Sequence, residues 1–242
     1  MILAEKLSYG LDQKLNKLST NEHQQIPVED KVIALNSAQI KLVKQKVDGN
    51  NLYKIGLDGF KKRYQDLQFL LENSENHPLN VILSDVYLNR YIAPVDTITP
   101  KFMFYIDSYM IAEKEECKDR VLYSNADLVK HTDLTTLLLN TNYKPSFEYQ
   151  EIIVDIASDE LHYYTDGTFT PKKVYLTYMR YPKEIDLAGY VKFDGTDSSN
   201  VDCELEDYLE DEILDLAVES LAMYTENQSA VVNAEKRIKD NE

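Results

Sequence analysis

The sequence predicts an α+β protein in which an antiparallel, β-rich region is inserted between N-terminal helices and a C-terminal helix that pack together. Apolar residues recur at helical spacing near both ends of the chain. Between His77 and Asn200, by contrast, lie six of the seven prolines and thirteen of the eighteen tyrosines. Tyrosine and β-branched residues favour pleated sheets, and proline marks strand ends. We therefore expect a helical region at 1–76 plus 203–242 and a β-rich region at 77–202.

Three helices are predicted in the N-terminal part of the chain. The second, in "VEDKVIALNSAQIKLVKQK", follows Pro27 and has acids at its start and lysines at its end, as the helix dipole favours. The third is predicted in "FKKRYQDLQFLLE", residues 60–72. The buried stripes of the three helices are predicted to be Leu3, Leu7, Leu11, Leu15 and Leu18; Val32, Leu35, Leu42 and Val43; and Phe60, Tyr64, Leu67 and Leu71.

A hairpin is the clearest turn signal in the β-rich region. Asp166-Gly167 separates two strand-like segments, so we expect a two-residue turn with positive φ at Gly167 that pairs them with each other. In the second segment, alternation places Val174, Leu176 and Tyr178 on one face. The predicted strands are 81–87, 101–111, 151–156, 160–165 and 172–181, with a short helical excursion near 124–140.

The final helix is predicted to begin in a run of acids, where the helix dipole favours negative charge. Residues 195–242 hold fourteen Asp or Glu against three Lys or Arg, which places −11 of the net charge of −16 in this segment. The acidic face is open to three interpretations: a solvated surface, a lining that keeps DNA from adhering, or a contact with basic residues of a partner. The predicted buried stripe, which would close the helical region, is Leu205, Leu209, Ile213, Leu216, Ala217, Leu221 and Tyr224.

The sequence contains no recognisable catalytic, cofactor or metal motif. Its four histidines are dispersed, and it has no HExxH, P-loop, G-x-S-x-G or G-x-G-x-x-G pattern. "DGTDSSNVDCE" (194–204) is close to a calcium loop, but Gly195 takes the second position and Thr196 a ligand position, so a surface loop is expected. The acids at 202–212 could supply a carboxylate pair, although a solvated helix start explains them better. We expect no enzymatic activity, no catalytic residues, and no metal or cofactor.

Composition also limits compartment and partners. Cys117 and Cys203 are far apart and match no metal or redox spacing, so free thiols in a reducing compartment are expected. No apolar run approaches the ~20 residues of a membrane span, and "MILAEKLSYGLDQKL" lacks the features of a signal peptide. No positive patch is visible that would bind DNA phosphates, so specific nucleic-acid binding is not expected.

Two groups of residues are candidate interface positions. One lies in the Tyr-rich strand near its proline, and the other on the acidic face of the final helix. Tyrosine offers a large contact area with a polar tip, although each tyrosine can equally serve the sheet core. A carbohydrate- or receptor-binding β-module with a Tyr-rich face is therefore the alternative to an assembly function. The candidate positions are Tyr178, Arg180, Tyr181, Glu206, Glu210 and Asp211.

Five stretches, in order, are characteristic: "VIALNSAQIKLVKQK", "HTDLTTLLLNTNYKPSFEY", "ELHYYTDGTF", "VYLTYMRYPKEIDLAGY" and "CELEDYLEDEILDLAVESLAMYTENQ". With these stretches the chain resembles the virion connector or ring proteins of crAss-like tailed bacteriophages, which are head-to-tail adaptors or tail rings. The resemblance implies a structural virion protein, made in the bacterial host cytoplasm, that forms a ring of about twelve copies. It also implies contacts with the portal and neighbouring ring or tail proteins, and genomic DNA passing nearby without sequence-specific binding.

Overall fold

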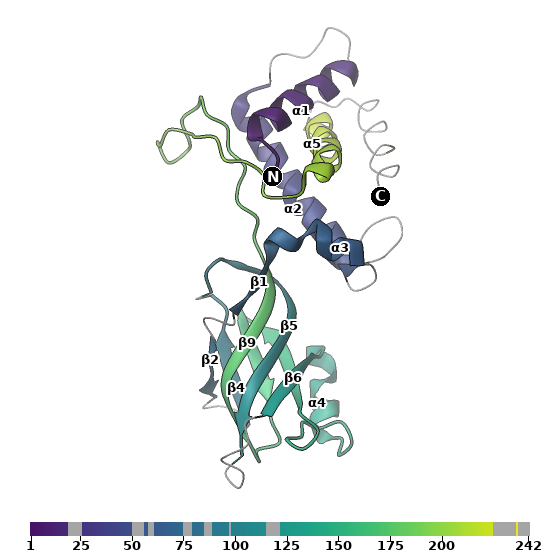
Figure 1. The fold of residues 1–242 in the computed structure, drawn as a ribbon, viewed down its shortest axis with the longest axis vertical. Helices are drawn as coiled ribbons and strands as arrows, with labels where there is room; N and C mark the ends of the chain where they lie inside the picture. The colour runs from purple at the N-terminus through teal and green to yellow at the C-terminus, as the bar shows by residue number, and fades with distance from the viewer. Residues whose placement is uncertain are drawn as a thin grey trace. The chain divides into compact units, whose positions relative to one another are not determined.

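The fold is known from a computed structural model, which describes residues 1–18, 26–49, 56–57, 61–74, 79–84, 89–96, 98–114, 122–224 and 236. The chain divides into a helical unit, Met1–Phe69 with Pro182–Glu242, and a sheet unit, Leu70–Tyr181 (Figure 1). The predicted α+β class, with a β-rich region inserted between helices that pack together, is confirmed. The boundaries differ from the prediction at both ends of the β-rich region: residues 182–202 belong to the helical unit, and the sheet unit begins at Leu70 and not at residue 77.

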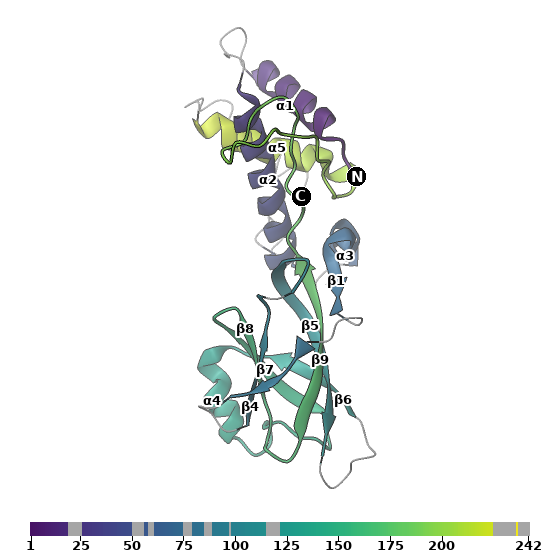
Figure 2. The ribbon, with the colours of Figure 1, turned by 90° about the vertical axis from the view of Figure 1, so that its left-hand side faces the viewer.

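The helical unit is built by α5 packing on α1 and α2 (Figure 2). A one-turn 3-10 helix, η5, leads into α5. The predicted stripes of α2 and α5 are buried as far as their side chains are described, whereas in α1 Leu3 precedes the helix and is exposed. The side chains of Leu18 and Tyr224 lie outside the described residues. The elements are α1 (Ala4–Leu18), α2 (Val28–Asp48), α3 (Lys61–Asp66), η5 (Asp207–Leu209) and α5 (Glu210–Tyr224).

Lysines from α1 and α2 neutralise the acidic side of α5. Apolar side chains bring the helices together, and the long lysine stems then reach the carboxylates across the contact. Each pair joins residues far apart in the sequence. Since these acids have cations beside them, α5 is not a bare acidic face. The pairs are Lys6 with Glu210, Lys14 with Asp211 and Asp215, Lys41 with Glu219, and Lys46 with Glu212.

Lys46 also lies at the centre of a buried polar cluster. Its Nζ is 3.0 Å from Asp66 Oδ2 and 2.8 Å from Glu212 Oε2, and the Tyr208 hydroxyl donates to Asp66 Oδ1 at 2.7 Å. Lys46 and Asp66 are only 3% and 2% exposed. Buried charges are stable only when paired and hydrogen-bonded, so this cluster fixes α2, α3 and the start of α5 to one another.

The sheet unit is a nine-stranded sheet in the order β1-β9-β5-β6-β7-β8-β4-β3, with β2 also paired to β9. All pairs are antiparallel except β6 with β7, which are joined through α4 (His131–Leu139). Residues 79–83 pair with β9 through β2 and with β4 through β3, so they close the sheet on itself. The strands are β1 (Leu71–Asn73), β2 (Leu79–Asn80), β3 (Ile82–Leu83), β4 (Arg90–Pro94), β5 (Phe102–Glu113), β6 (Leu122–Leu128), β7 (Glu151–Ala157), β8 (Glu160–Tyr164) and β9 (Thr170–Arg180).

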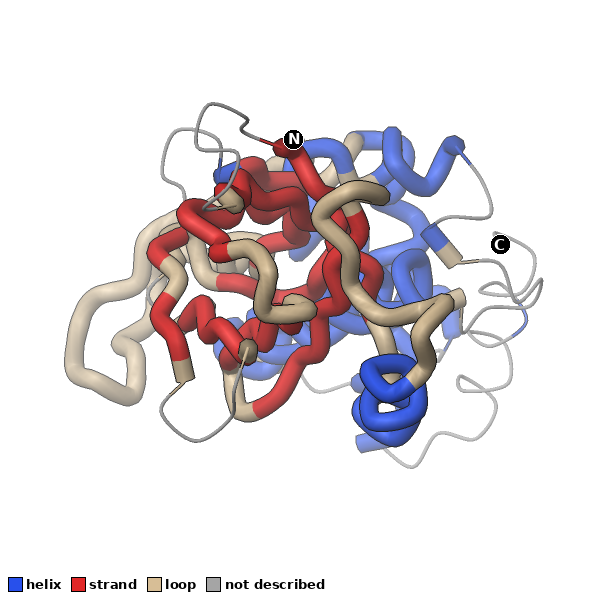
Figure 3. Tube along the Cα trace, turned by 90° about the horizontal axis from the view of Figure 1, so that it is seen from below, coloured by secondary structure: helices blue, strands red, loops and turns tan. Residues whose placement is uncertain are grey.

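Figure 3 shows the strands of the sheet unit from below. The side chains that the closed sheet encloses form an apolar core. Val174, Leu176 and Tyr178 face into it, as the alternation in β9 predicts. Tyr163 is also enclosed, and its hydroxyl donates to Ser108 Oγ at 3.1 Å; the hydroxyls of Tyr105 and Ser108 are 2.9 Å apart. Burial raises the pKa of Tyr105 to about 12. The tyrosines of this interior are structural and present no free surface.

The hairpin prediction at Asp166-Gly167 is wrong in its pairing. Gly167 has the expected positive φ of 85°, but β8 pairs with β7 and β4, and β9 pairs with β5, β1 and β2. The segment between them is a connection from one part of the closed sheet to another. The two-residue hairpin turn lies instead at Ser158-Asp159, where both φ angles are positive and Ala157 opposes Glu160.

Other predicted elements also change. The third helix ends at Asp66, because Leu71–Asn73 pairs with β9, and of its predicted stripe only Leu67 is buried; Phe60 lies outside the described residues. The helical segment predicted near 124–140 begins instead as strand β6, which ends at Leu128. The helix, α4, starts only at His131. The strand predicted at 81–87 is reduced to β3, and residues 85–88 lie outside the described part of the chain.

Replacing Lys46 by Met should destabilise the helical unit by about 3–5 kcal/mol, because Asp66 would stay buried without its cation. Lys6→Met, on α1, is the control. Lys6 pairs with Glu210 and both side chains are partly exposed, at 59% and 20%, so its loss should cost no more than about 1 kcal/mol. Urea unfolding followed by far-UV circular dichroism measures both values, and equal losses would contradict the role given to Lys46.

Changing Ser158-Asp159 to Asn-Gly should stabilise the sheet unit by roughly 0.5–1 kcal/mol. Both positions require positive φ, which Asn and Gly adopt at lower cost than Ser and Asp. Thermal unfolding of the double variant tests this, and a lowered midpoint would show that the side chains of Ser158 and Asp159 stabilise the turn in some other way.

Candidate functional site

The predicted interface residues of β9 do not form one exposed patch. Tyr178 is 2% exposed, its hydroxyl donates to the Pro100 carbonyl at 3.0 Å, and its ring lies beside Phe102. Tyr178 is therefore a core residue, because its alternation in β9 turns it inward. Arg180 donates from Nε to Glu72 at 3.1 Å. Tyr181 alone is exposed, with Lys101 Nζ 5.0 Å from its ring centroid.

The predicted acidic interface positions are mostly engaged within the helical unit. Glu210 pairs with Lys6, and Glu206 accepts a hydrogen bond from Gln68. Asp211 lies 3.0 Å from Lys14 Nζ, yet its side chain is 78% exposed. Glu210 and Asp211 therefore join α5 to α1, Glu206 joins the start of the final helix to the segment after α3, and only Asp211 turns its carboxylate largely to solvent.

The segment between Tyr181 and α5 forms a hairpin on the helical unit, which we call the connector hairpin (residues 186–201). Asp186 and Val201 close it with two backbone hydrogen bonds of 3.1 and 3.0 Å. Near its tip, the backbone amide of Lys192 donates to the Thr196 carbonyl at 2.9 Å. The turn contains Gly195, whose φ is 82°. Asp194 accepts from the Thr196 amide at 2.9 Å, as is common for Asp at the start of a tight turn.

One buried carboxylate holds the base of the connector hairpin together. Asp186 accepts from Tyr190 OH at 2.9 Å, from the Leu187 amide at 2.9 Å and from Lys192 Nζ at 2.7 Å. Burial raises the pKa of Asp186, but the hydrogen bonds from Lys192, Tyr190 and the backbone outweigh burial and hold the pKa below its ordinary value. Burial, followed by the bond to Asp186, raises the pKa of Tyr190 to about 12.

Helix α2 fixes the start of the connector hairpin. Asn36 accepts from the Ile185 amide at 2.8 Å and donates to the Ile185 carbonyl at 2.8 Å. One turn further along α2, Gln39 donates to the Lys183 carbonyl at 3.0 Å and accepts from Cys203 Sγ at 3.1 Å. Cys203 is a buried free thiol, as predicted, whereas Cys117 lies outside the described residues. Two amide side chains on one helix face thus hold both ends of the segment.

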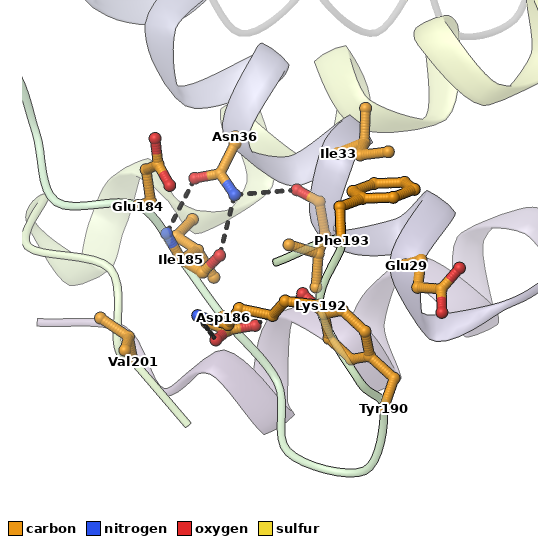
Figure 4. A pocket seen from close by; sticks show the side chains of 11 residues that line it. Glu29, Ile33, Asn36, Glu184, Ile185, Asp186, Tyr190, Lys192, Phe193 and Val201 are labelled. Atoms are coloured by element: carbon orange, nitrogen blue, oxygen red, sulfur yellow. Dashed lines mark hydrogen bonds and ion pairs between the residues drawn. The ribbon is translucent and has the colours of Figure 1, made fainter. Parts of the chain in front are cut away.

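A cavity of about 380 Å³ lies between α2 and the connector hairpin, and we call it the connector hollow (Figure 4). Ile33 and Phe193 border it, and Phe193 is 98% exposed although the hairpin that carries it is fully braced. Val191, on the same arm, is exposed as well. Exposed apolar side chains next to a hollow are typical of protein-binding surfaces. Its lining comprises Glu29, Val32, Ile33, Asn36, Glu184, Ile185, Asp186, Tyr190, Lys192, Phe193 and Val201.

A polar cluster on the outer side of the sheet, under α4, serves packing. His131 Nδ1 is 2.6 Å from Asp155 Oδ2, which joins the first turn of α4 to β7. His162, opposite Asp155 on β8, is 3.2 Å from Glu160 through Nε2. Across the part of the chain that the structure describes, no three His, Cys, Asp or Glu side chains lie together as a metal ion would require. Residues 194–201 of the calcium-like segment lie in the connector hairpin, which isolated bridges between Asp186 and Val201 and between Val191 and Asp197 hold together.

Sequence reasoning missed the connector hairpin as a site. A usable signal was present, because Val191 and Phe193 alternate with polar residues and lead into Asp194-Gly195, a strong hairpin dipeptide. A surface loop is predicted there instead, because Gly195 and Thr196 depart from the calcium-loop pattern. The exposure of Phe193 could not have been read from the sequence, since alternation gives two faces but not which one is covered.

Known proteins give no direct guide to this site. No family model matches the chain, and no curated protein matches its sequence. Within the described residues, no helix is both long and apolar enough to cross a lipid bilayer.

Tyr190→Phe should move the pKa of Asp186 upward, because one of the hydrogen bonds that lower it is lost. A depressed pKa stabilises the hairpin above the ordinary carboxyl pKa of 3.8, and that stability is lost as the pH falls through the folded value. In the Tyr190→Phe variant, this pH-dependent stability should therefore be lost at a higher pH than in the wild type. NMR titration of the Asp186 carboxyl measures the shift, and Tyr208→Phe, which affects Asp66 instead, should leave the titration unchanged.

Proposed function

We propose that this chain is a structural subunit that assembles with copies of itself into a closed ring. The connector hairpin is the single observation that carries this proposal. A fully exposed Phe193 on a braced turn has little conformational freedom left to lose, so covering it by another molecule gains apolar burial at low entropic cost. Asp186, Tyr190 and Lys192 at the base of the hairpin are bonded to one another, so the exposed apolar surface is the feature that we assign to recognition.

The setting we propose is the virion of a tailed bacteriophage, in the portal or head-to-tail connector or in the tail. The resemblance of five stretches to the connector and ring proteins of crAss-like phages supports this setting. Such a ring would hold about twelve copies, contact the portal and neighbouring ring or tail proteins, and surround the passage of the genome. The net charge of −16 is suited to such a passage, because DNA phosphates are repelled and do not adhere.

Phe193→Asp should weaken self-assembly by about 10–100-fold, the equivalent of losing one buried aromatic contact per interface. Sedimentation velocity of the purified protein over a range of concentrations measures the effect. Tyr9→Asp is the matched control, because Tyr9 is also an exposed aromatic residue, on α1, and does not border the hollow. Its assembly should equal that of the wild type.

Two results would contradict the proposal. A wild-type protein that stays monomeric at all concentrations excludes a self-assembling subunit. A Phe193→Asp variant that assembles like the wild type excludes the connector hairpin as the contact. For the setting in the virion, the protein should be found in purified phage particles at the neck or tail by labelling with a specific antibody and electron microscopy.

A further inference from the structure

We infer that the connector hollow of one copy receives the surface at the end of α4 of a second copy. This surface, the α4-end surface, consists of Leu139, Tyr143, Lys144 and Tyr149. The inference rests on the proposed self-assembly and names the two surfaces that meet. It is carried by the exposure of the apolar side chains and by the charges beside them.

The connector hollow and the α4-end surface carry the most exposed large apolar side chains among the described residues. Among the large apolar side chains that the structure describes, the three most exposed are Phe193 at 98%, Leu139 at 81% and Tyr149 at 79%. The first borders the connector hollow, and the other two belong to the end of α4 and the segment after it. Tyr143, one turn beyond Leu139, is exposed too. Its amide is held by the Asn140 carbonyl at 3.2 Å, so this surface also has a defined backbone.

The charges at the two surfaces are complementary. Glu29 and Glu184 line the connector hollow, and within the described residues neither has a cation at ion-pair distance, whereas Asp186 is paired with Lys192. Lys144 at the α4-end surface is exposed and likewise has no acid at that distance among the described residues. Glu148, its acidic neighbour, pairs with Lys114 at 3.4 Å. A cation flanked by apolar side chains therefore fits a hollow with an apolar wall and an acidic rim.

Contact between unlike surfaces gives the symmetry that a ring needs. The hollow lies on the helical unit and the α4-end surface on the sheet unit, so each copy offers one of each. A contact between unlike patches repeats head to tail and gives a ring when the rotation between copies closes, whereas contact between identical patches ends at a dimer. Two connector hollows facing each other would also place Glu29 and Glu184 against their own copies, which like-charge repulsion opposes.

A charge-swap experiment tests the pairing. Lys144→Glu alone, and Glu29→Lys with Glu184→Lys, should each weaken self-assembly at least about tenfold in sedimentation velocity. The triple variant should recover assembly to within a few fold of the wild type, because every interface in the ring then has its charges exchanged. Lys130→Glu, at the other end of α4 and also exposed, is the control and should assemble normally.

The outcomes separate the two proposals. A monomeric wild type overturns the proposed function itself. A wild type that assembles, with Lys144→Glu and Leu139→Asp both assembling equally well, overturns this inference and leaves self-assembly standing. Weakened single variants without recovery in the triple variant also overturn the inference, because the charges then act on different partners. Circular dichroism of each variant must match the wild type, so that loss of assembly is not loss of fold.

Discussion

The helical unit depends on pairing between the acids of α5 and the lysines of α1 and α2. Apolar burial brings α5 onto these helices, and Lys6, Lys14, Lys41 and Lys46 then neutralise five carboxylates that would otherwise repel one another. Lys46 and Lys14 each pair with an acid that is itself buried, Asp66 and Asp215, so removal of either lysine leaves a charge buried without its cation. Asn36 and Gln39 of α2 hold both ends of residues 183–203, so the chain between them can project as a hairpin without loosening the unit.

Local rules predicted much of the fold. The 3.6-residue period predicted α2 and α5 with their buried faces, and alternation in β9 predicted that Val174, Leu176 and Tyr178 share one face. These local rules do not predict which strands pair with one another. Asp166-Gly167 bends the chain as glycine allows, yet β8 and β9 find other neighbours because the closed sheet buries more apolar surface than a simple hairpin. The true two-residue turn, Ser158-Asp159, lacks glycine and gave no signal.

The candidate site was the least predictable part, for a related reason. The acids of α5 look like a free surface in the sequence, because their lysine partners lie far away along the chain. The sequence suggests Tyr178 as an interface residue because tyrosine offers a large contact area. Alternation in β9 gives the residues that share its face, but not that this face is the buried one. Phe193, by contrast, looks like an ordinary strand residue in the sequence. Only the packing of the residues around Asp186 shows that its side chain is exposed.

These contacts describe a chain whose polar groups serve internal bracing and whose exposed apolar groups remain for assembly. A cryo-electron microscopy structure of the assembled protein tests this account most directly. We expect a closed ring in which Phe193 of each copy is covered by the α4-end surface of its neighbour, with Lys144 near Glu29 and Glu184. A closed assembly in which Phe193 faces solvent would contradict the account.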